Sequence, residues 1–175
     1  MDSVATLREQ FKTAHGMLEG TMQDVTADQA SWSPPGIANP LGATYAHTAI
    51  GEDLMVNGML KGAAPFALSS WASKAGVSEP PPMPDQGDWD QWARKVKVDV
   101  GALRQYAQAV YQNTDQYLAS LDDAALDKEI DLSAFHLGKQ TVGWFLGNIL
   151  LSHVHHHCGE ISCLKGVQGT KGYPF

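Results

Sequence analysis

The chain has few basic side chains and no strongly basic segment. Its 175 residues include 12 Lys and Arg against 19 Asp and Glu, which gives a formal net charge of -7. A surface that binds nucleic acid needs Lys and Arg clustered on one face. Here they are scattered, apart from a small group at Arg94, Lys95 and Lys97. We therefore expect no nucleic-acid partner.

Long apolar runs are also missing, and there are only two cysteines. No stretch reaches the ~18 consecutive apolar residues that a membrane-spanning helix needs. The N-terminal residues Met-Asp-Ser-Val-Ala-Thr-Leu-Arg lack the charged and apolar regions of a signal peptide. Cys158 and Cys163 lie about 140° apart around a helix, which disfavours a disulfide between them. Two lone cysteines suit a reducing compartment, so we expect no membrane partner and a cytoplasmic location.

What the sequence does contain is helical periodicity, in four long segments. Apolar residues recur on one face at about residues 3–24, 40–61, 88–121 and 141–166. The Gly-, Ala-, Ser- and Pro-rich stretch 62–87 indicates a long loop, a type that often forms a lid or a binding loop. No convincing alternating strand pattern is present. The sequence predicts one all-α domain over residues 1–175, a four-helix bundle with long crossover loops.

Histidine is concentrated near the C-terminus, inside the last helical segment. Four of the seven histidines lie within Leu151–Glu160. His153 and His157 are four residues apart, so both side chains lie on one face, which they share with Glu160. Burying two imidazoles in an apolar stripe is costly unless each has a partner, and neutral imidazole is a common metal ligand. The pattern predicts a metal site; the alternatives are a hydrogen-bonded polar network and a face exposed in a cleft.

Two histidines need further protein ligands to hold a metal ion. His47 is the best candidate, because it lies on the apolar stripe of the 40–61 helix. His15 and His156 are expected at most to line the cavity or to hydrogen-bond a ligand, and for His15 an ordinary core position is the more common outcome. Glu52 and Asp53 lie off the His47 face and are expected to be solvated or capping charges.

These residues resemble the DinB-like superfamily, whose members are also described as YfiT-type metal-dependent hydrolases. The matching segments are Ala43-Thr-Tyr-Ala-His47 and Leu150-Leu-Ser-His153-Val-His-His-His157-Cys-Gly-Glu160. The resemblance implies a four-helix bundle of DinB-like type with a metal site formed by His47, His153 and His157. Cys158 replaces the usual Arg and Glu160 the usual Gln. Glu160 could therefore act as a general base, or serve only as a structural carboxylate.

The resemblance also implies a class of function. Family members include thiol S-transferases and isomerases that depend on bacillithiol or mycothiol. It implies a metal-dependent hydrolase or thiol S-transferase for a small molecule, with a low-molecular-weight thiol as a possible co-substrate and a homodimer as the assembly. Zinc or nickel is expected because imidazole suits both, and three imidazoles with an open position are typical of catalytic sites. The alternatives are a non-catalytic, stress-associated metal-binding bundle, closed by a fourth ligand such as His15 or Glu160, and a metal-free interaction protein.

Overall fold

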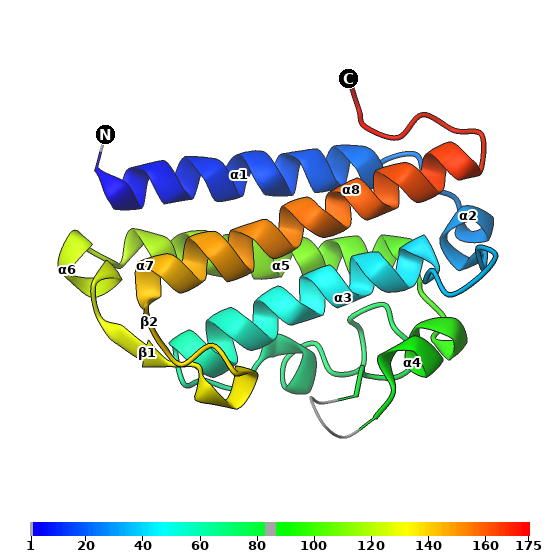
Figure 1. Cartoon of the computed structure of the whole chain (residues 1–175). Helices are drawn as coiled ribbons and strands as arrows, with labels where there is room; N and C mark the ends of the chain where they lie inside the picture. The colour runs from blue at the N-terminus through cyan, green and yellow to red at the C-terminus, as the bar shows by residue number, and fades with distance from the viewer. Residues whose placement is uncertain (1, 83–86) are drawn as a thin grey trace.

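Four long helices run side by side and form the body of the protein (Figure 1). The computed structural model describes residues 2–82 and 87–175. Within them α3 packs on α8 and α5, and α1 packs on α5 and α8. The prediction of an all-α four-helix bundle is confirmed. The helices are α1 (Ser3–Met22), α3 (Leu41–Asp53), α5 (Val100–Ala119) and α8 (Ser152–Val167).

The central helix of the bundle is α3, which is buried on almost every side. Its sequence, LGATYAHTAIGED, consists mainly of small and apolar residues, and His47 is its only titratable imidazole, carboxyl or amine before the last two positions. A helix that is apolar all round belongs in the interior. By contrast, α1 buries a single stripe that includes Phe11, Leu18 and Met22, as its pattern predicts.

Two of the four expected segments contain a π-helical stretch within a continuous helical path. Helix α3 runs directly into η1 (Leu54–Leu60), and α7 (Val142–Phe145) runs through η4 (Leu146–Leu151) into α8. Taken whole, these paths match the expected ranges 40–61 and 141–166. Short π-helical segments inside α-helices are frequent at functional sites.

The prediction of one continuous helix over residues 88–121 is wrong. The structure divides it into α4 (Trp89–Lys95) and α5, each with its own aspartate N-cap, Asp88 and Asp99. Between them Val98 pairs with Val77 in an isolated bridge. The flanking backbone bonds run from Ser78 N to Lys97 O and from Asp99 N to Gly76 O. This pairing gives the backbone between α4 and α5 hydrogen-bond partners in a distant segment. The helix is therefore interrupted despite its periodic apolar pattern.

The remaining elements are short and connect the bundle helices. The structure has a small antiparallel hairpin in the connector where no strand was expected, with Ile130 opposite Gln140. Residues 83–86 of the expected 62–87 loop lie outside the described residues. The connecting elements are α2 (Ala27–Ser31), η2 (Phe66–Leu68), α6 (Asp123–Leu126), β1 (Glu129–Asp131), η3 (Ser133–Phe135) and β2 (Lys139–Thr141).

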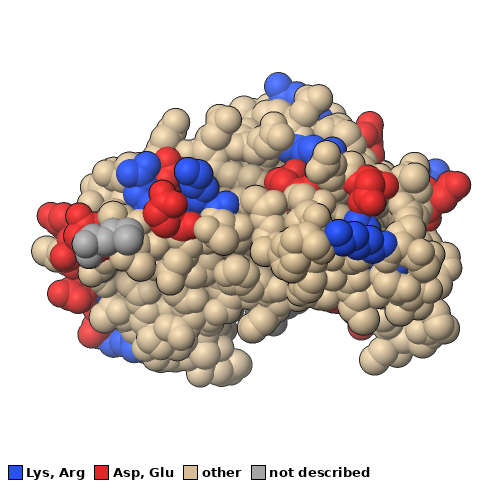
Figure 2. Space-filling view, turned by 90° about the horizontal axis from the view of Figure 1, so that it is seen from above, with Lys and Arg blue, Asp and Glu red and all other residues tan. Residues whose placement is uncertain are grey.

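Charges of both signs are interspersed on the face seen in Figure 2, which carries small mixed groups and no continuous basic patch. None of the helices in the described ranges has both the length and the apolar character to cross a membrane.

Candidate metal centre

Three histidines from two helices converge where α3 packs against α8. His47 lies in the middle of α3, and His153 and His157 lie one turn apart on α8. Their candidate ligand atoms all lie within 4.8 Å of one another, and His47 Nε2 is 2.9 Å from His153 Nε2. The cluster that the sequence singles out is therefore brought together, and it could hold a divalent metal ion.

The close approach of the two helices depends on a glycine. Gly51 follows His47 by one helical turn, and a Cβ at Gly51 would lie 3.1 Å from His153 Cε1. That spacing is tighter than ordinary van der Waals contact, so a side chain there would press on the imidazole. The His47 ring meets Trp89 edge-on, with ring centroids 4.1 Å apart. Gly51 thus leaves room for the His153 ring, and Trp89 packs against the His47 ring.

Burial keeps two of the three imidazoles neutral. It lowers the pKa of His47 to about 4, with His157 contributing, and it lowers the pKa of His153 to about 3, with His47 and His157 contributing. Both rings therefore present lone pairs at neutral pH, which is the form that binds metals. Two lone pairs 2.9 Å apart repel each other unless a proton or a cation lies with them. The donor set of this structure therefore fits a metal ion.

The third histidine is oriented by a carboxylate on its own helix. His157 Nδ1 lies 2.9 Å from Glu160 Oε2. A carboxylate accepts a hydrogen bond from the ring N–H that it faces, which places the hydrogen on Nδ1 and leaves the lone pair on Nε2. The shared face predicted for His153, His157 and Glu160 is thus realised, with Glu160 directed at His157 as a hydrogen-bond partner.

Two cavities meet at the histidines. The smaller one, of about 210 Å³, is named the polar cavity for its five polar side chains, those of Asn39, Thr44, His47, His157 and Glu160; Ala43, Trp89 and Ala93 complete its wall. A second one, of about 550 Å³, is bordered by His47 and His153 and otherwise has an apolar wall. The cluster thus lies between a small cavity of mixed lining and a larger cavity that is almost wholly apolar.

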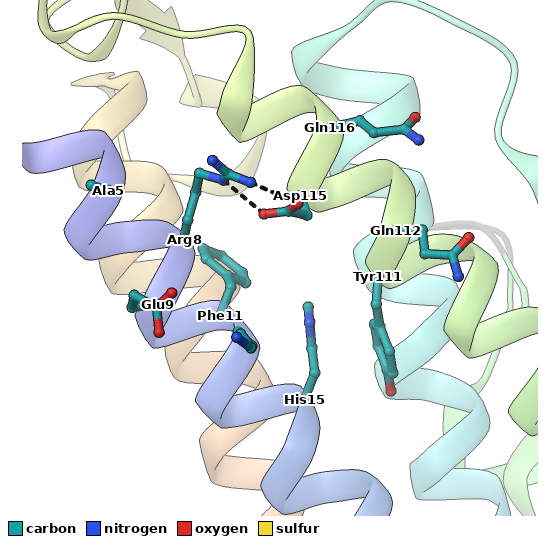
Figure 3. Close-up of a pocket in the computed structure, with 10 residues that line it drawn as sticks. Ala5, Arg8, Glu9, Phe11, His15, Tyr111, Gln112, Asp115 and Gln116 are labelled. Atoms are coloured by element: carbon teal, nitrogen blue, oxygen red, sulfur yellow. Dashed lines mark hydrogen bonds and ion pairs between the residues drawn. The ribbon is translucent and has the colours of Figure 1, made fainter.

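His15 does not join this cluster. Its Nε2 lies 2.9 Å from Glu52 Oε2, and its ring stacks on Tyr111 with centroids 3.8 Å apart. Figure 3 shows His15 between α1 and α5, in a separate cavity of about 770 Å³ whose upper part is crossed by the Arg8–Asp115 ion pair. The expectation that His15 could line the metal-site cavity or bond a ligand is not met, because Glu52 already holds its ring nitrogen.

Glu52 and Asp53 are both fully buried, so the expectation of solvated or capping charges is wrong. Glu52 Oε1 accepts from the Thr114 hydroxyl at 2.6 Å. Asp53 accepts from Asn57 and Tyr106 and from two backbone amides of η2, those of Phe66 and Ala67. The projection of one helix carried no signal for this burial, because the partners of the two carboxylates lie on α1, α5 and η2.

The other polar residues of the last helix lie away from the cluster's interior. His155 and His156 are both exposed, so the expectation of a cavity-lining His156 is not met. Cys158 is buried with its Sγ 3.6 Å from Thr21 Oγ1, opposite to a ligand position, as its helical angle predicts. Both cysteines are free thiols.

Comparisons with known proteins agree with this architecture. A family model described as the DinB superfamily matches residues 10–161, a range that contains all three clustered histidines. The crystal structure of a conserved protein from Enterococcus faecalis superposes with a TM-score of 0.82, covering 97% of this chain and 99% of that one. The two sequences are 24% identical, so this likeness shows the fold alone. No curated protein matches the chain.

Proposed function

Because this chain belongs to the DinB superfamily, we propose that it is a metal-dependent enzyme acting on a small molecule, with His47, His153 and His157 as the metal ligands. The observation that carries this proposal is the position of the three imidazoles at the junction of two cavities. Within residues 2–82 and 87–175 the group contains no fourth histidine, cysteine or carboxylate. A site with three protein ligands and room for another molecule is typical of catalysis.

Zinc and nickel are the proposed metals, because neutral imidazole suits both. When bound, such an ion would lower the pKa of a water or a thiol and polarise a carbonyl group. The protein's own part is to present three lone pairs, to fix the His157 ring through Glu160, and to divide the surroundings into a polar and an apolar side.

Glu160 is proposed to have a second role, as a proton acceptor. It lines the polar cavity and bonds His157 through Oε2, and its side chain is 39% exposed. A carboxylate in that position has lone pairs left to take a proton from a water or a thiol entering the polar cavity. Both reaction classes, hydrolysis and transfer of a low-molecular-weight thiol, need this step.

The competing function is a non-catalytic metal-binding bundle, in which the ion only joins α3 to α8. Such a site is closed by a fourth protein ligand. Of the two candidates for that position, His15 is paired with Glu52, and Glu160 is not among the residues whose candidate ligand atoms lie within 4.8 Å of one another. This favours the enzyme.

Metal content of untagged protein, measured by plasma mass spectrometry, tests the proposal. We expect about one zinc or nickel per chain in the wild type and loss of the metal in His47→Ala and His153→Ala. His155→Ala, an exposed histidine on the same helix, is the matched control and should retain the metal. Metal-loaded protein should then hydrolyse an ester or an amide, or catalyse the reaction of a thiol with an electrophile. Absence of metal from every folded sample would refute the enzyme.

A homodimer is proposed on family resemblance alone. Sedimentation equilibrium should then give twice the 18.9 kDa chain mass. A single species at the chain mass would refute it.

A further inference from the structure

The cavity of about 550 Å³ beside the histidines has no charged side chain in its described wall. Elements distant in sequence contribute the same kind of surface: α3 and η1, η2 with the segment around Pro81, α4, the connector around the hairpin, and α7, η4 and α8. Apart from His47 and His153 the wall consists of Gly51, Gly58, Ile50, Leu54, Met55, Met59, Pro65, Leu68, Pro81, Pro82, Trp89, Leu132, Phe135, Leu137, Phe145 and Ile149.

The cavity and the candidate metal centre share two side chains. His47 and His153 line the apolar cavity, whereas His157 and Glu160 line the polar one, and His47 borders both. A molecule that filled the apolar cavity would therefore end at the paired Nε2 atoms of His47 and His153. Its other contacts would be with aliphatic and aromatic groups.

Several of the wall residues are exposed apolar side chains. Phe135 is 47% exposed, Leu137 39% and Leu68 56%. All three lie in connecting segments, Leu68 and Phe135 at the ends of η2 and η3 and Leu137 just before β2. Exposed apolar side chains that gather around a cavity mark a binding site more often than a bare surface.

We propose that this cavity binds the body of a neutral, apolar molecule, aliphatic or aromatic, and directs its one polar reactive group at His47 and His153. A charged body is disfavoured because its lost hydration would find no charged partner among the residues of this wall that the structure describes. The volume lies within the range of small-molecule sites, about 300–1,000 Å³. The claim that a reactive group faces the two histidines rests on the proposed function. The claim that the cavity binds an apolar body does not.

The test is a binding titration with N-phenyl-1-naphthylamine, a neutral fluorescent probe, on metal-free and metal-loaded wild-type protein. We expect saturable binding to one site in both forms. Straight-chain alcohols from butanol to octanol should displace the probe, each methylene tightening competition by roughly three- to fourfold. Glucose, polar and of similar size, should not displace it.

Two glycines in the π-helical segments supply a matched pair of variants. Gly58 lines the cavity, and a Cβ there meets only Pro65 Cγ at 3.7 Å; Gly147 lines none of the cavities described, and a Cβ there meets nothing within 4 Å. Gly58→Leu should weaken probe binding at least tenfold, and Gly147→Leu should leave it unchanged. Leu68→Lys is the second variant, used if Gly58→Leu does not fold. It places a charge at an exposed position of the wall and should weaken probe binding severalfold.

The assignment is overturned if no saturable binding occurs, if Gly58→Leu and Leu68→Lys bind as the wild type does, or if glucose competes as well as octanol. Because the metal-free protein is titrated too, the result is separable from the metal measurement. If the protein binds the probe but takes up no metal in the metal measurement, the enzyme is refuted and the apolar site stands. If it takes up metal but does not bind the probe, the apolar site is refuted and the enzyme stands.

Discussion

His15 and Glu52 form a buried pair that joins α1 to α3, with His15 Nε2 2.9 Å from Glu52 Oε2. The opposite carboxylate oxygen accepts from Thr114 on α5, at 2.6 Å. One side chain on the central helix thereby ties two neighbouring helices to it. The pair belongs to the bundle's interior and lies apart from the three clustered histidines.

His15→Ala should therefore lower stability without disturbing the metal centre. It removes one partner of a fully buried carboxyl group and the ring that stacks on Tyr111, and losses of this kind cost about 3 kcal/mol. Urea denaturation followed by circular dichroism measures the loss. Glu9→Gln, an exposed change on the same helix, should stay within about 0.5 kcal/mol. Equal stabilities for the two variants, or loss of metal in His15→Ala, would contradict the structural role.

Glu160→Ala should weaken metal binding about 10- to 100-fold, the usual cost of removing the group that orients a ligating histidine. Glu160→Gln keeps an oxygen that can accept from His157 Nδ1 and should lose much less. Competition with a chromophoric chelator gives both affinities. If Glu160→Gln and Glu160→Ala lose affinity equally, the carboxylate acts through its charge and not through the bond to His157.

Metal-free protein should lose stability on acidification because of two partly buried imidazoles, those of His47 and His153. The folded-state pKa values, about 4 for His47 and about 3 for His153, lie below the unfolded value of about 6.5. The stability that this difference contributes is complete above pH 6.5 and is lost as the pH falls toward 4, because the unfolded chain then binds protons that the folded chain does not.

His153→Asn removes one of these groups and provides the comparison. Between pH 6 and pH 4 the wild type should lose about 1 kcal/mol more per pH unit than the variant. Denaturant titrations at each pH, with chelator present throughout, measure the difference. If the stabilities of wild type and variant change equally with pH, His153 takes up its proton as readily in the folded protein as in the unfolded chain.

Asp53 should control the order of the segment that contributes Leu68 to the apolar cavity. It accepts from the backbone amides of Phe66 and Ala67 at 3.0 and 2.8 Å and from the Tyr106 hydroxyl at 2.7 Å. In Asp53→Ala the two amides lose their acceptor, so their hydrogen exchange should accelerate at least tenfold. Tyr106→Phe leaves both amide bonds in place and should cost about 1 kcal/mol of stability with little local change in exchange. Uniform acceleration over the whole chain would indicate global destabilisation instead.

Periodicity and residue spacing were enough to predict the bundle and the metal cluster. The four-residue spacing of His153 and His157 fixes their common face, and the stripe on the second segment places His47 opposite them. The break before Asp99 could not be predicted, because it depends on Val98 pairing with Val77, which is distant in sequence. The burial of Glu52 and Asp53 was missed for a related reason: their partners come from other helices and loops, whose positions a single-helix projection does not contain.

A π-helical segment sets the rotation of the cavity-wall residues before it relative to the histidines that follow it on the same helical path. A π-helical turn holds more residues than an α-helical one, and Leu146–Leu151 lies between Phe145 and His153. Deleting one residue from that segment would turn everything before it by about 100° relative to the histidines. Phe145 would then leave the cavity while the spacing of His153 and His157 stayed intact. A single codon lost or gained here would thus change the wall of the apolar cavity and leave intact the spacing of the two α8 histidines proposed as metal ligands.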